Sequence, residues 1–154
     1  MTKTEIIQIL TGFVGSLGFA VLFNIRGRRL VAAALGGLFS WTLFVVLCDY
    51  VENEAVNYFI VALVMSLYAE VLARALKTPT TTFVTPALVP LIPGGSLYYT
   101  MSYAFAGELD SFVQKAIATL QLASALALGV IIAAALIKMA CGLLDRIRRP
   151  VESK

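Results

Sequence analysis

The chain has 154 residues, of which 60% are hydrophobic and only 14% charged, and its mean hydropathy is +0.89. Soluble domains carry about 25% charged residues, so this composition excludes an ordinary soluble protein and predicts an integral membrane protein with a single domain, residues 1–154. The chain has no histidine, which excludes a histidine-based catalytic triad or metal site. We therefore expect no enzymatic activity, no metal and no cofactor.

Five apolar runs are long enough to cross a bilayer, which takes about 20 residues per helix. In chain order they cover residues 6–23, 30–48, 56–76, 82–105 and 112–141. The fold class that this pattern predicts is an all-α, five-helix transmembrane bundle whose fourth span is broken at Pro93-Gly94-Gly95.

The first two predicted spans carry small residues at helical spacing. These residues are Gly12, Gly15, Ser16 and Gly18 in the first span, and Ala32, Gly36 and Ser40 in the second. Small residues let membrane helices approach closely, although they are also common in any membrane helix. Asn24 directly follows the first span. It either caps the helix or lines a cytoplasmic vestibule, and capping is the favoured interpretation.

The third predicted span contains Glu70, the only acidic residue inside a predicted span. Arg74 follows one turn later, at the i, i+4 spacing that allows an ion pair. Acids inside a membrane are costly and usually functional, often as proton carriers. Glu70 with Arg74 is therefore the candidate proton-coupling pair. The alternative is a purely structural pair in which Arg74 reaches the membrane interface.

The fourth predicted span lies between Lys77 and Glu108, and no charged residue occurs between these two. The span contains Pro86, Pro90 and Pro93. Prolines and a double glycine should break a helix near the middle of the membrane. Non-helical backbone at that depth is tolerated only where protein or a water-filled cavity covers it. Helices interrupted in this way are a sequence indication of a transporter's substrate site.

Ser96 follows the break and is a good N-cap residue, so we expect a half-helix to start there. Its free N–H groups and positive dipole end would suit an anionic group such as a carboxylate. The alternative is a proline kink without a ligand. The candidate substrate-binding residues are Pro93, Gly94, Gly95, Ser96 and Tyr99.

The fifth predicted span again carries small residues at i, i+4 and i+8, namely Ala125, Gly129 and Ala133. The basic residues then fix one orientation for the five spans. Ten of the 12 Lys and Arg residues fall on one side: Arg26, Arg28, Arg29, Arg74, Lys77, Lys138, Arg146, Arg148, Arg149 and Lys154. The positive-inside rule makes this side cytoplasmic, with the N-terminus outside and the C-terminus inside. Because the net charge of +3 arises at span ends, we expect no nucleic-acid partner. A re-entrant fourth segment would leave four spans and an inconsistent charge pattern.

Three segments resemble the threonine/serine exporter family. They are residues 18–24 (GFAVLFN), residues 90–98 (PLIPGGSLY), and residues 69–74 (AEVLAR) followed by Lys77-Thr78-Pro79. The similarity extends from about residue 12 to residue 135 and is closest to the C-terminal half of the family, which also occurs as a separate small subunit. The resemblance implies a multi-pass protein of a prokaryotic plasma membrane that exports small hydrophilic metabolites at the expense of the proton motive force. The exported metabolites are threonine and serine in fused members and a dicarboxylate such as succinate in some split ones.

The resemblance also implies a larger membrane subunit that carries the family's N-terminal half, with five spans and a similar Pro-Gly motif of its own. The sequence therefore predicts one half of a secondary transporter for a small anionic or zwitterionic substrate, embedded in lipid and able to form homo-oligomers. The alternative is a structural or assembly subunit that scaffolds the partner without binding substrate. A scaffold has no need for unwound backbone in the membrane. An ion channel is less favoured because no charged ring or filter-like repeat is visible.

Overall fold

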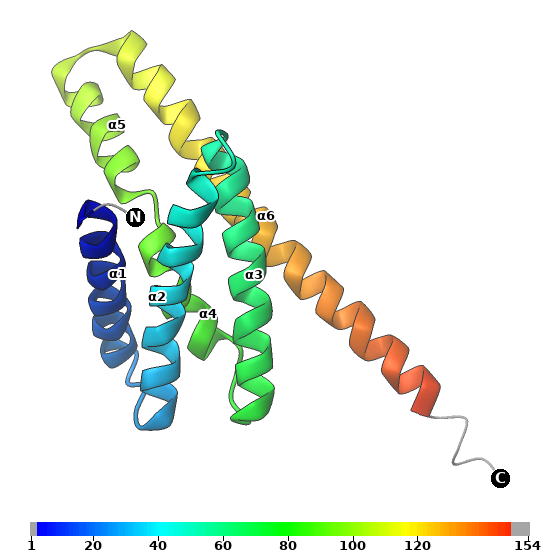
Figure 1. Cartoon of the computed structure of the whole chain (residues 1–154). Helices are drawn as coiled ribbons and strands as arrows, with labels where there is room; N and C mark the ends of the chain where they lie inside the picture. Colours follow the sequence, from blue (N-terminus) through cyan, green and yellow to red (C-terminus); the bar gives the residue numbers. More distant parts are fainter. Residues whose placement is uncertain (1–2, 149–154) are drawn as a thin grey trace.

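The computed structural model describes residues 3–148, with side chains for residues 3–142. The described chain is all-α, as predicted, and contains no strand (Figure 1). Its elements are α1 (Lys3–Leu22), α2 (Arg28–Cys48), α3 (Glu54–Ala75), α4 (Thr81–Leu88), the short 3₁₀ helix η1 (Val89–Leu91), α5 (Gly94–Ala106) and α6 (Leu109–Arg148). The side chains of Arg146, Arg148, Arg149 and Lys154, which the charge pattern assigns to the cytoplasm, lie outside the described residues.

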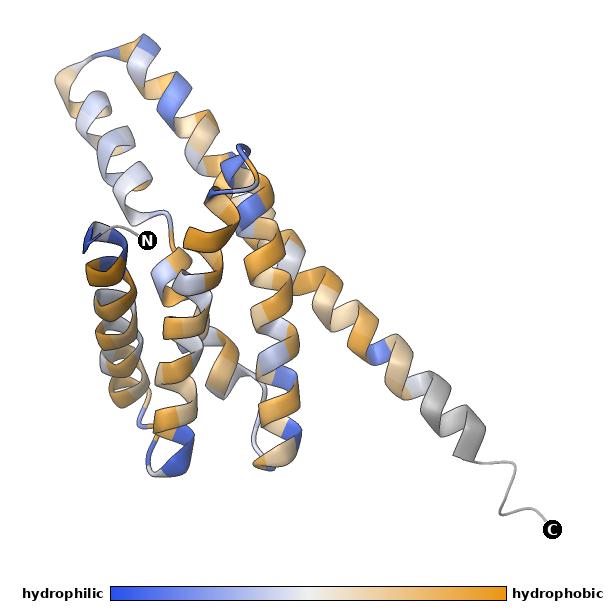
Figure 2. Cartoon of the chain, in the orientation of Figure 1, coloured by the Kyte–Doolittle hydropathy of each residue, from blue (hydrophilic) through white to orange (hydrophobic). Residues whose placement is uncertain are grey.

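Four helices in the described part of the chain are long and apolar enough to cross a membrane: α1, α2, α3 and residues 109–142 of α6. Figure 2 shows hydrophobic residues along these helices and hydrophilic residues at their connections. The fourth predicted span, residues 82–105, is divided among α4, η1 and α5, none of which has this length. The fifth crossing therefore remains a prediction.

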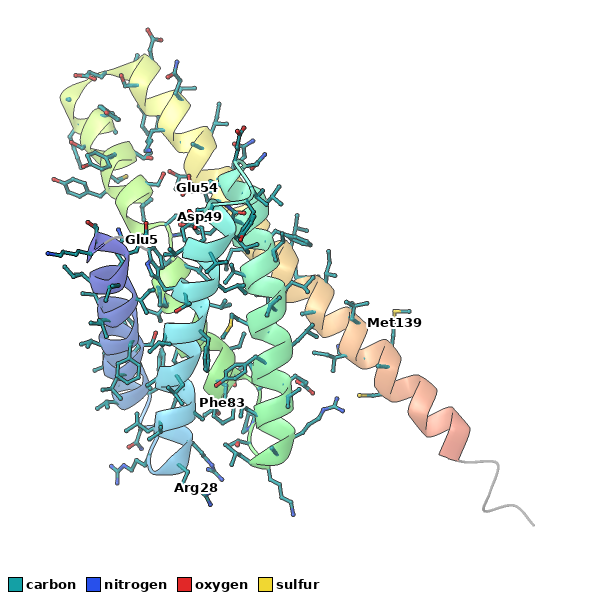
Figure 3. All side chains as sticks on the ribbon, viewed as in Figure 1. Glu5, Arg28, Asp49, Glu54, Phe83 and Met139 are labelled. Carbon is teal, nitrogen blue, oxygen red and sulfur yellow. The ribbon has the colours of Figure 1, made fainter. Side chains whose placement is uncertain are left out.

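The segment formed by α4 and η1 is the core of the bundle. It contacts α1, α2 and α3. Phe83, Ala87 and Leu91 follow one another at i, i+4 and i+8 on one face, and all three are fully buried. Phe83 lies low in the bundle in Figure 3, among the side chains of its neighbours. A proline-rich segment therefore forms the part of the fold that the longer helices enclose.

Small residues allow these close approaches at some of the predicted positions. A Cβ added at Gly36 of α2 would lie 2.9 Å from the Cβ of Ala87, and one added at Gly129 of α6 would lie 2.7 Å from the carbonyl oxygen of Phe59. At Gly37, which the sequence pattern did not single out, an added Cβ would overlap the side chain of Ser16. Close helix packing is thus confirmed for α2 and α6.

The pattern on α1 is only partly used for packing. A Cβ at Gly12 would lie 3.4 Å from the Cβ of Trp41 and 3.6 Å from Pro90. At Gly15 and Gly18 an added Cβ would meet no atom of the described residues within 4 Å. These two glycines therefore face away from the helices of the described chain.

Three helices end in the same backbone motif, which reverses the chain tightly. Asn24 has φ of 57° after α1, Lys77 has 49° after α3 and Gly107 has 76° after α5. At the end of α1, the N–H of Ile25 donates to the Ala20 carbonyl at 3.0 Å and the N–H of Asn24 donates to the Val21 carbonyl at 2.9 Å. This is a Schellman motif with Asn24 in the left-handed position. The prediction that Asn24 caps α1 is confirmed.

Several acidic residues lie at one end of the bundle, and Arg28 lies at the other. Figure 3 shows Glu5, Asp49 and Glu54 toward one end and Arg28 at the other. In Figure 1, α5 and the start of α6 form a hairpin that projects beyond the N-terminal end of α1. This hairpin lies at the acidic end.

Candidate functional site

The break in the fourth predicted span lies at Ile92 and Pro93. The 3₁₀ helix ends at Leu91, Ile92 is extended with φ −63° and ψ 121°, and Pro93 is the N-cap of α5. A residue before proline is driven toward extended backbone, and proline offers no N–H to continue a helix. The prediction that Gly94, Gly95 and Ser96 are non-helical is therefore wrong. All three lie in the first turn of α5.

Ser96 is consequently not an N-cap, and its hydroxyl serves the contact between α5 and α6. Its Oγ lies 2.8 Å from Oγ1 of Thr119, which in turn lies 3.1 Å from Oγ1 of Thr100. The Thr100 hydroxyl also donates to the Ser96 carbonyl at 2.8 Å. These hydroxyls satisfy one another between two apolar helices, where an unpaired polar group would be costly.

The double glycine faces open space. A Cβ added at Gly94 or Gly95 would meet no atom of the described residues within 4 Å, and neither glycine has a positive φ. Neither neighbouring atoms of the described chain nor backbone angles therefore require glycine at these two positions. The side chain of Tyr99, one turn further along α5, is 54% exposed. Whether these residues bind substrate remains a prediction.

The depth of the break can be read from its neighbours. Pro90 of η1 lies against Gly12, which is halfway along α1, and Trp41 of α2 contacts the same glycine. The irregular segment thus begins level with the middle of α1, and α5 starts beyond it.

Glu70 lies at the centre of a polar cluster near the C-terminal end of α3. Its Oε1 accepts a hydrogen bond from Nε of Arg74 at 2.9 Å, and its Oε2 accepts one from the hydroxyl of Thr80 at 2.6 Å. The predicted i, i+4 ion pair is therefore confirmed as a contact. Arg74 also donates through Nη2 to Sγ of Cys141 in α6, at 2.7 Å. The cluster joins α3, the start of α4 and α6.

The turn between α3 and α4 places Thr80 next to Glu70. The left-handed residue Lys77 ends α3, and the N–H of Thr78 donates to the Ala73 carbonyl at 2.9 Å. Pro79 cannot continue the helix, so the chain reverses and Thr80 becomes the N-cap of α4. The sequence analysis identified Glu70 and Arg74 but missed Thr80. The helix stop just before the threonine run was the available signal.

A cavity of about 340 Å³ lies beside Glu70, between α3, α4 and α6. Its polar lining comprises Ser66, Glu70, Thr80, Thr81 and Lys138, and its apolar lining comprises Val84, Val130, Ala134 and Ile137. Of these residues, the sequence analysis assigned a site role to Glu70 alone and used Lys138 only for topology. The Glu70 side chain is 22% exposed and so remains accessible from the cavity.

A second cavity, of about 280 Å³, lies on the other side of the α4 N-terminus and is lined by Phe23, Ile25, Thr81, Thr82 and Thr85. Thr81 lines both cavities. Asn24 does not line this second cavity, and its Oδ1 instead accepts a hydrogen bond from Nε of Arg26 at 2.9 Å. The structure thus places Asn24 beside a cavity but employs it as a helix cap.

The chemistry available here is that of polar recognition and proton exchange. The cavities offer one carboxylate, one ammonium group and several hydroxyls. No cluster of three or more His, Cys, Asp or Glu residues that could hold a metal ion occurs among the described residues. Pro93, Gly94, Gly95, Ser96 and Tyr99 line neither cavity, so the two predicted groups of site residues are separate in the fold.

Comparison of the chain with curated proteins and with solved structures gave no match. Comparison with protein families did: residues 8–136 match the threonine/serine exporter family, ThrE. The matched region includes most of α1, all of α2 to α5, the residues Glu70, Arg74 and Thr80, and residues 109–136 of α6. It is a family of transporters in the membrane, in agreement with the apolar helices. The chain therefore belongs to the threonine/serine exporter family.

Proposed function

We propose that this chain is one half of a secondary transporter that exports small amino acids or carboxylic acids. The substrates considered are threonine and serine, or a dicarboxylate such as succinate. The other half is a larger membrane subunit of the type that carries the family's N-terminal region. Export is driven by the proton motive force, and Glu70 carries the proton.

One observation carries this proposal: a carboxylate on a helix long and apolar enough to cross a membrane lies at the wall of a mainly aliphatic cavity. A charged side chain at the centre of a membrane helix costs about 2.5–3.5 kcal/mol. Glu70 lies nearer the end of α3, where the cost is smaller, but ionisable residues within membrane spans usually have a functional role. Glu70 has partners on both oxygens and still faces the cavity. A purely structural pair with Arg74 would need no cavity beside it.

The proposed topology is five crossings of a prokaryotic plasma membrane, with α4, η1 and α5 together making the fourth. The N-terminus is outside and the C-terminus is cytoplasmic. The separation of Arg28 from Asp49 and Glu54 supports this orientation. Two related halves with an odd number of spans insert in opposite orientations, which is the inverted-repeat plan of many transporters. Thiol labelling of Arg28→Cys tests it, because labelling from the outside alone contradicts this topology.

The proposed substrate path also passes the break, at Pro93, Gly94, Gly95, Ser96 and Tyr99. The open space around both glycines supports a surface that meets the partner half. The test is Gly95→Val, which adds bulk where nothing in this chain opposes it. Normal insertion and assembly with lost export supports a substrate path. Normal export reduces the break to a kink and favours the scaffold function.

The central experiment is Glu70→Gln, which keeps the shape of the side chain and removes its charge. We expect normal insertion and loss of pH-driven export of threonine, measured in cells that also contain the partner subunit. The matched control is Glu108→Gln, which changes an exposed acid in the α5–α6 connection. Unchanged pH-driven export by the Glu70 variant would make the residue structural.

A further inference from the structure

The wall of the cavity beside Glu70 carries both signs of charge. Glu70 belongs to α3, and Lys138 belongs to α6. The hydroxyl-bearing residues Ser66, Thr80 and Thr81 complete the polar part of the wall, and the rest is aliphatic. The polar groups are a small part of a mainly aliphatic wall, and the Ser66 and Thr80 hydroxyls already donate to the Ala62 carbonyl and to Glu70. The carboxylate and the ammonium group are complementary to the two charges of a small zwitterion.

The size of the cavity favours a small ligand. Its volume of about 340 Å³ is at the lower end of the range of about 300–1,000 Å³ that small-molecule sites occupy. A few polar groups in an aliphatic wall are also typical of such sites, because they orient the ligand while the wall excludes water.

Glu70 retains acceptor capacity for a ligand. Each carboxylate oxygen has two lone-pair positions. Oε1 receives one hydrogen bond from Arg74, and Oε2 receives one from Thr80. Arg74 directs its remaining contact to Cys141, and these two residues line a different, adjacent cavity. Arg74 therefore contacts Glu70 from outside the cavity, and the remaining lone-pair positions of the carboxylate are available to a ligand.

The charged and titratable groups near Glu70 come from α3 itself and from two of the helices packed against it, α2 and α6. They are Arg74 on α3 itself, Lys138 and Cys141 on α6, and, at the end of α3, Lys77 and Arg29 of α2, whose Nη2 lies 3.5 Å from the Leu76 carbonyl. The described part of α4 contributes hydroxyls and no charge. Among these groups Glu70 is the one acid, so a ligand cation and a proton must use the same carboxylate.

We propose that a small amino acid binds in this cavity with its ammonium group on Glu70 and its carboxylate on Lys138, and that the amino acid and a proton occupy Glu70 in alternation. The inference rests on the proposed function and gives it a coupling device. When the ammonium group arrives, the O–H bond of the protonated carboxyl breaks and the proton passes to water on the cytoplasmic side. The ammonium group keeps its three N–H bonds. On the outer side a proton returns to Glu70 and the amino acid leaves.

The test is calorimetric titration of the purified full-length chain in lipid nanodiscs with L-threonine. Measurements at several acidic to neutral pH values, in buffers of different ionisation enthalpy, count the protons released. We expect release to approach one proton per threonine at acidic pH, where the apparent affinity falls about tenfold per pH unit. Succinate, which has no ammonium group, should neither bind in this way nor displace threonine.

Matched variants separate the roles of the two charges. Glu70→Gln should weaken threonine binding about tenfold or more and abolish proton release. Lys138→Gln should weaken binding by a similar factor and keep proton release. Glu70→Asp, which keeps a carboxylate, should also keep release and serves if the glutamine variant fails to fold. Glu108→Gln, far from the cavity, should match the unmodified chain.

Several results would overturn the inference. They are pH-independent threonine binding, binding unaffected by Glu70→Gln, displacement of threonine by succinate, and no threonine binding by the folded chain. Its failure is distinct from failure of the proposed function. A Glu70→Gln protein that loses export but binds threonine normally refutes alternation at this site and leaves Glu70 as a proton carrier. A Glu70→Gln protein that exports threonine with unchanged pH dependence refutes proton coupling through Glu70.

Discussion

The crossing of α3 and α6 depends on a single glycine, and replacing it gives a quantitative test of the fold. A Cβ at Gly129 would lie 2.7 Å from the Phe59 carbonyl oxygen, 2.8 Å from the Ala62 Cβ and 3.1 Å from the Leu63 nitrogen. Two of these three atoms belong to backbone, which cannot rotate away. The helices must therefore separate by roughly 0.5–1 Å to restore contacts of about 3.5 Å.

The cost follows from overpacking. Inserting a carbon into a well-packed contact costs about 1–3 kcal/mol. Alanine also gains up to about 1 kcal/mol over glycine inside any helix. Gly142 lies in the same helix and supplies the matched control, because a Cβ there would meet no described atom within 4 Å. Gly142→Ala therefore gains helix propensity without any overpacking cost. The free energy of unfolding of Gly129→Ala should be lower than that of Gly142→Ala by about 1–3 kcal/mol.

The assay is unfolding in mixed micelles by increasing fractions of denaturing detergent. Circular dichroism and the fluorescence of Trp41, the single tryptophan, report the transition. Equal stability of the two alanine variants would refute the reasoning, because it would mean that α6 does not approach the α3 backbone at Gly129.

Three further predictions concern polar contacts and helix ends. Asn57 is 1% exposed and its Nδ2 donates to the Val51 carbonyl at 3.0 Å, so Asn57→Ala should lower the free energy of unfolding by about 1–3 kcal/mol in the same assay. Asn24→Val should cost about 1–2 kcal/mol because a branched residue resists positive φ, whereas Asn24→Gly should be nearly neutral; equal effects would contradict the Schellman cap. Thr119→Val removes the hydroxyl that lies 2.8 Å from Ser96, so amide hydrogen exchange in α5 should accelerate, while Thr119→Ser should preserve the slower rate.

Features that depend on neighbours in the chain were predictable from the sequence. Apolar length predicted α1, α2, α3 and the membrane-crossing part of α6 because a bilayer demands about 20 apolar residues. The ion pair of Glu70 with Arg74 was predictable because residues at i and i+4 share a helix face. The cap at Asn24 was predictable because Asn adopts the left-handed conformation more readily than most residues.

The position of the break shows where local reasoning was insufficient. The sequence indicated a break near Pro93, since proline interrupts the hydrogen-bond ladder whatever surrounds it. The prediction then extended the irregular backbone through Gly95 and Ser96. In the fold, helix α5 begins directly after Pro93, where glycine is tolerated, and its first turns are held by the Thr119 hydroxyl of α6. That contact joins two helices and was not visible in either one.

The sequence by itself thus determined a membrane-embedded helical protein, its long helices, its proline break and one intramembrane acid. Only the tertiary structure decided that α4 and η1 form the core and that Thr80 and Lys138 come to the cavity beside Glu70. The physical reason is the range of the interactions. Hydropathy, capping and i, i+4 pairing act within a few residues, whereas the cavity requires α3, α4 and α6 to pack together, and that packing is set by contacts such as Gly129 against Phe59.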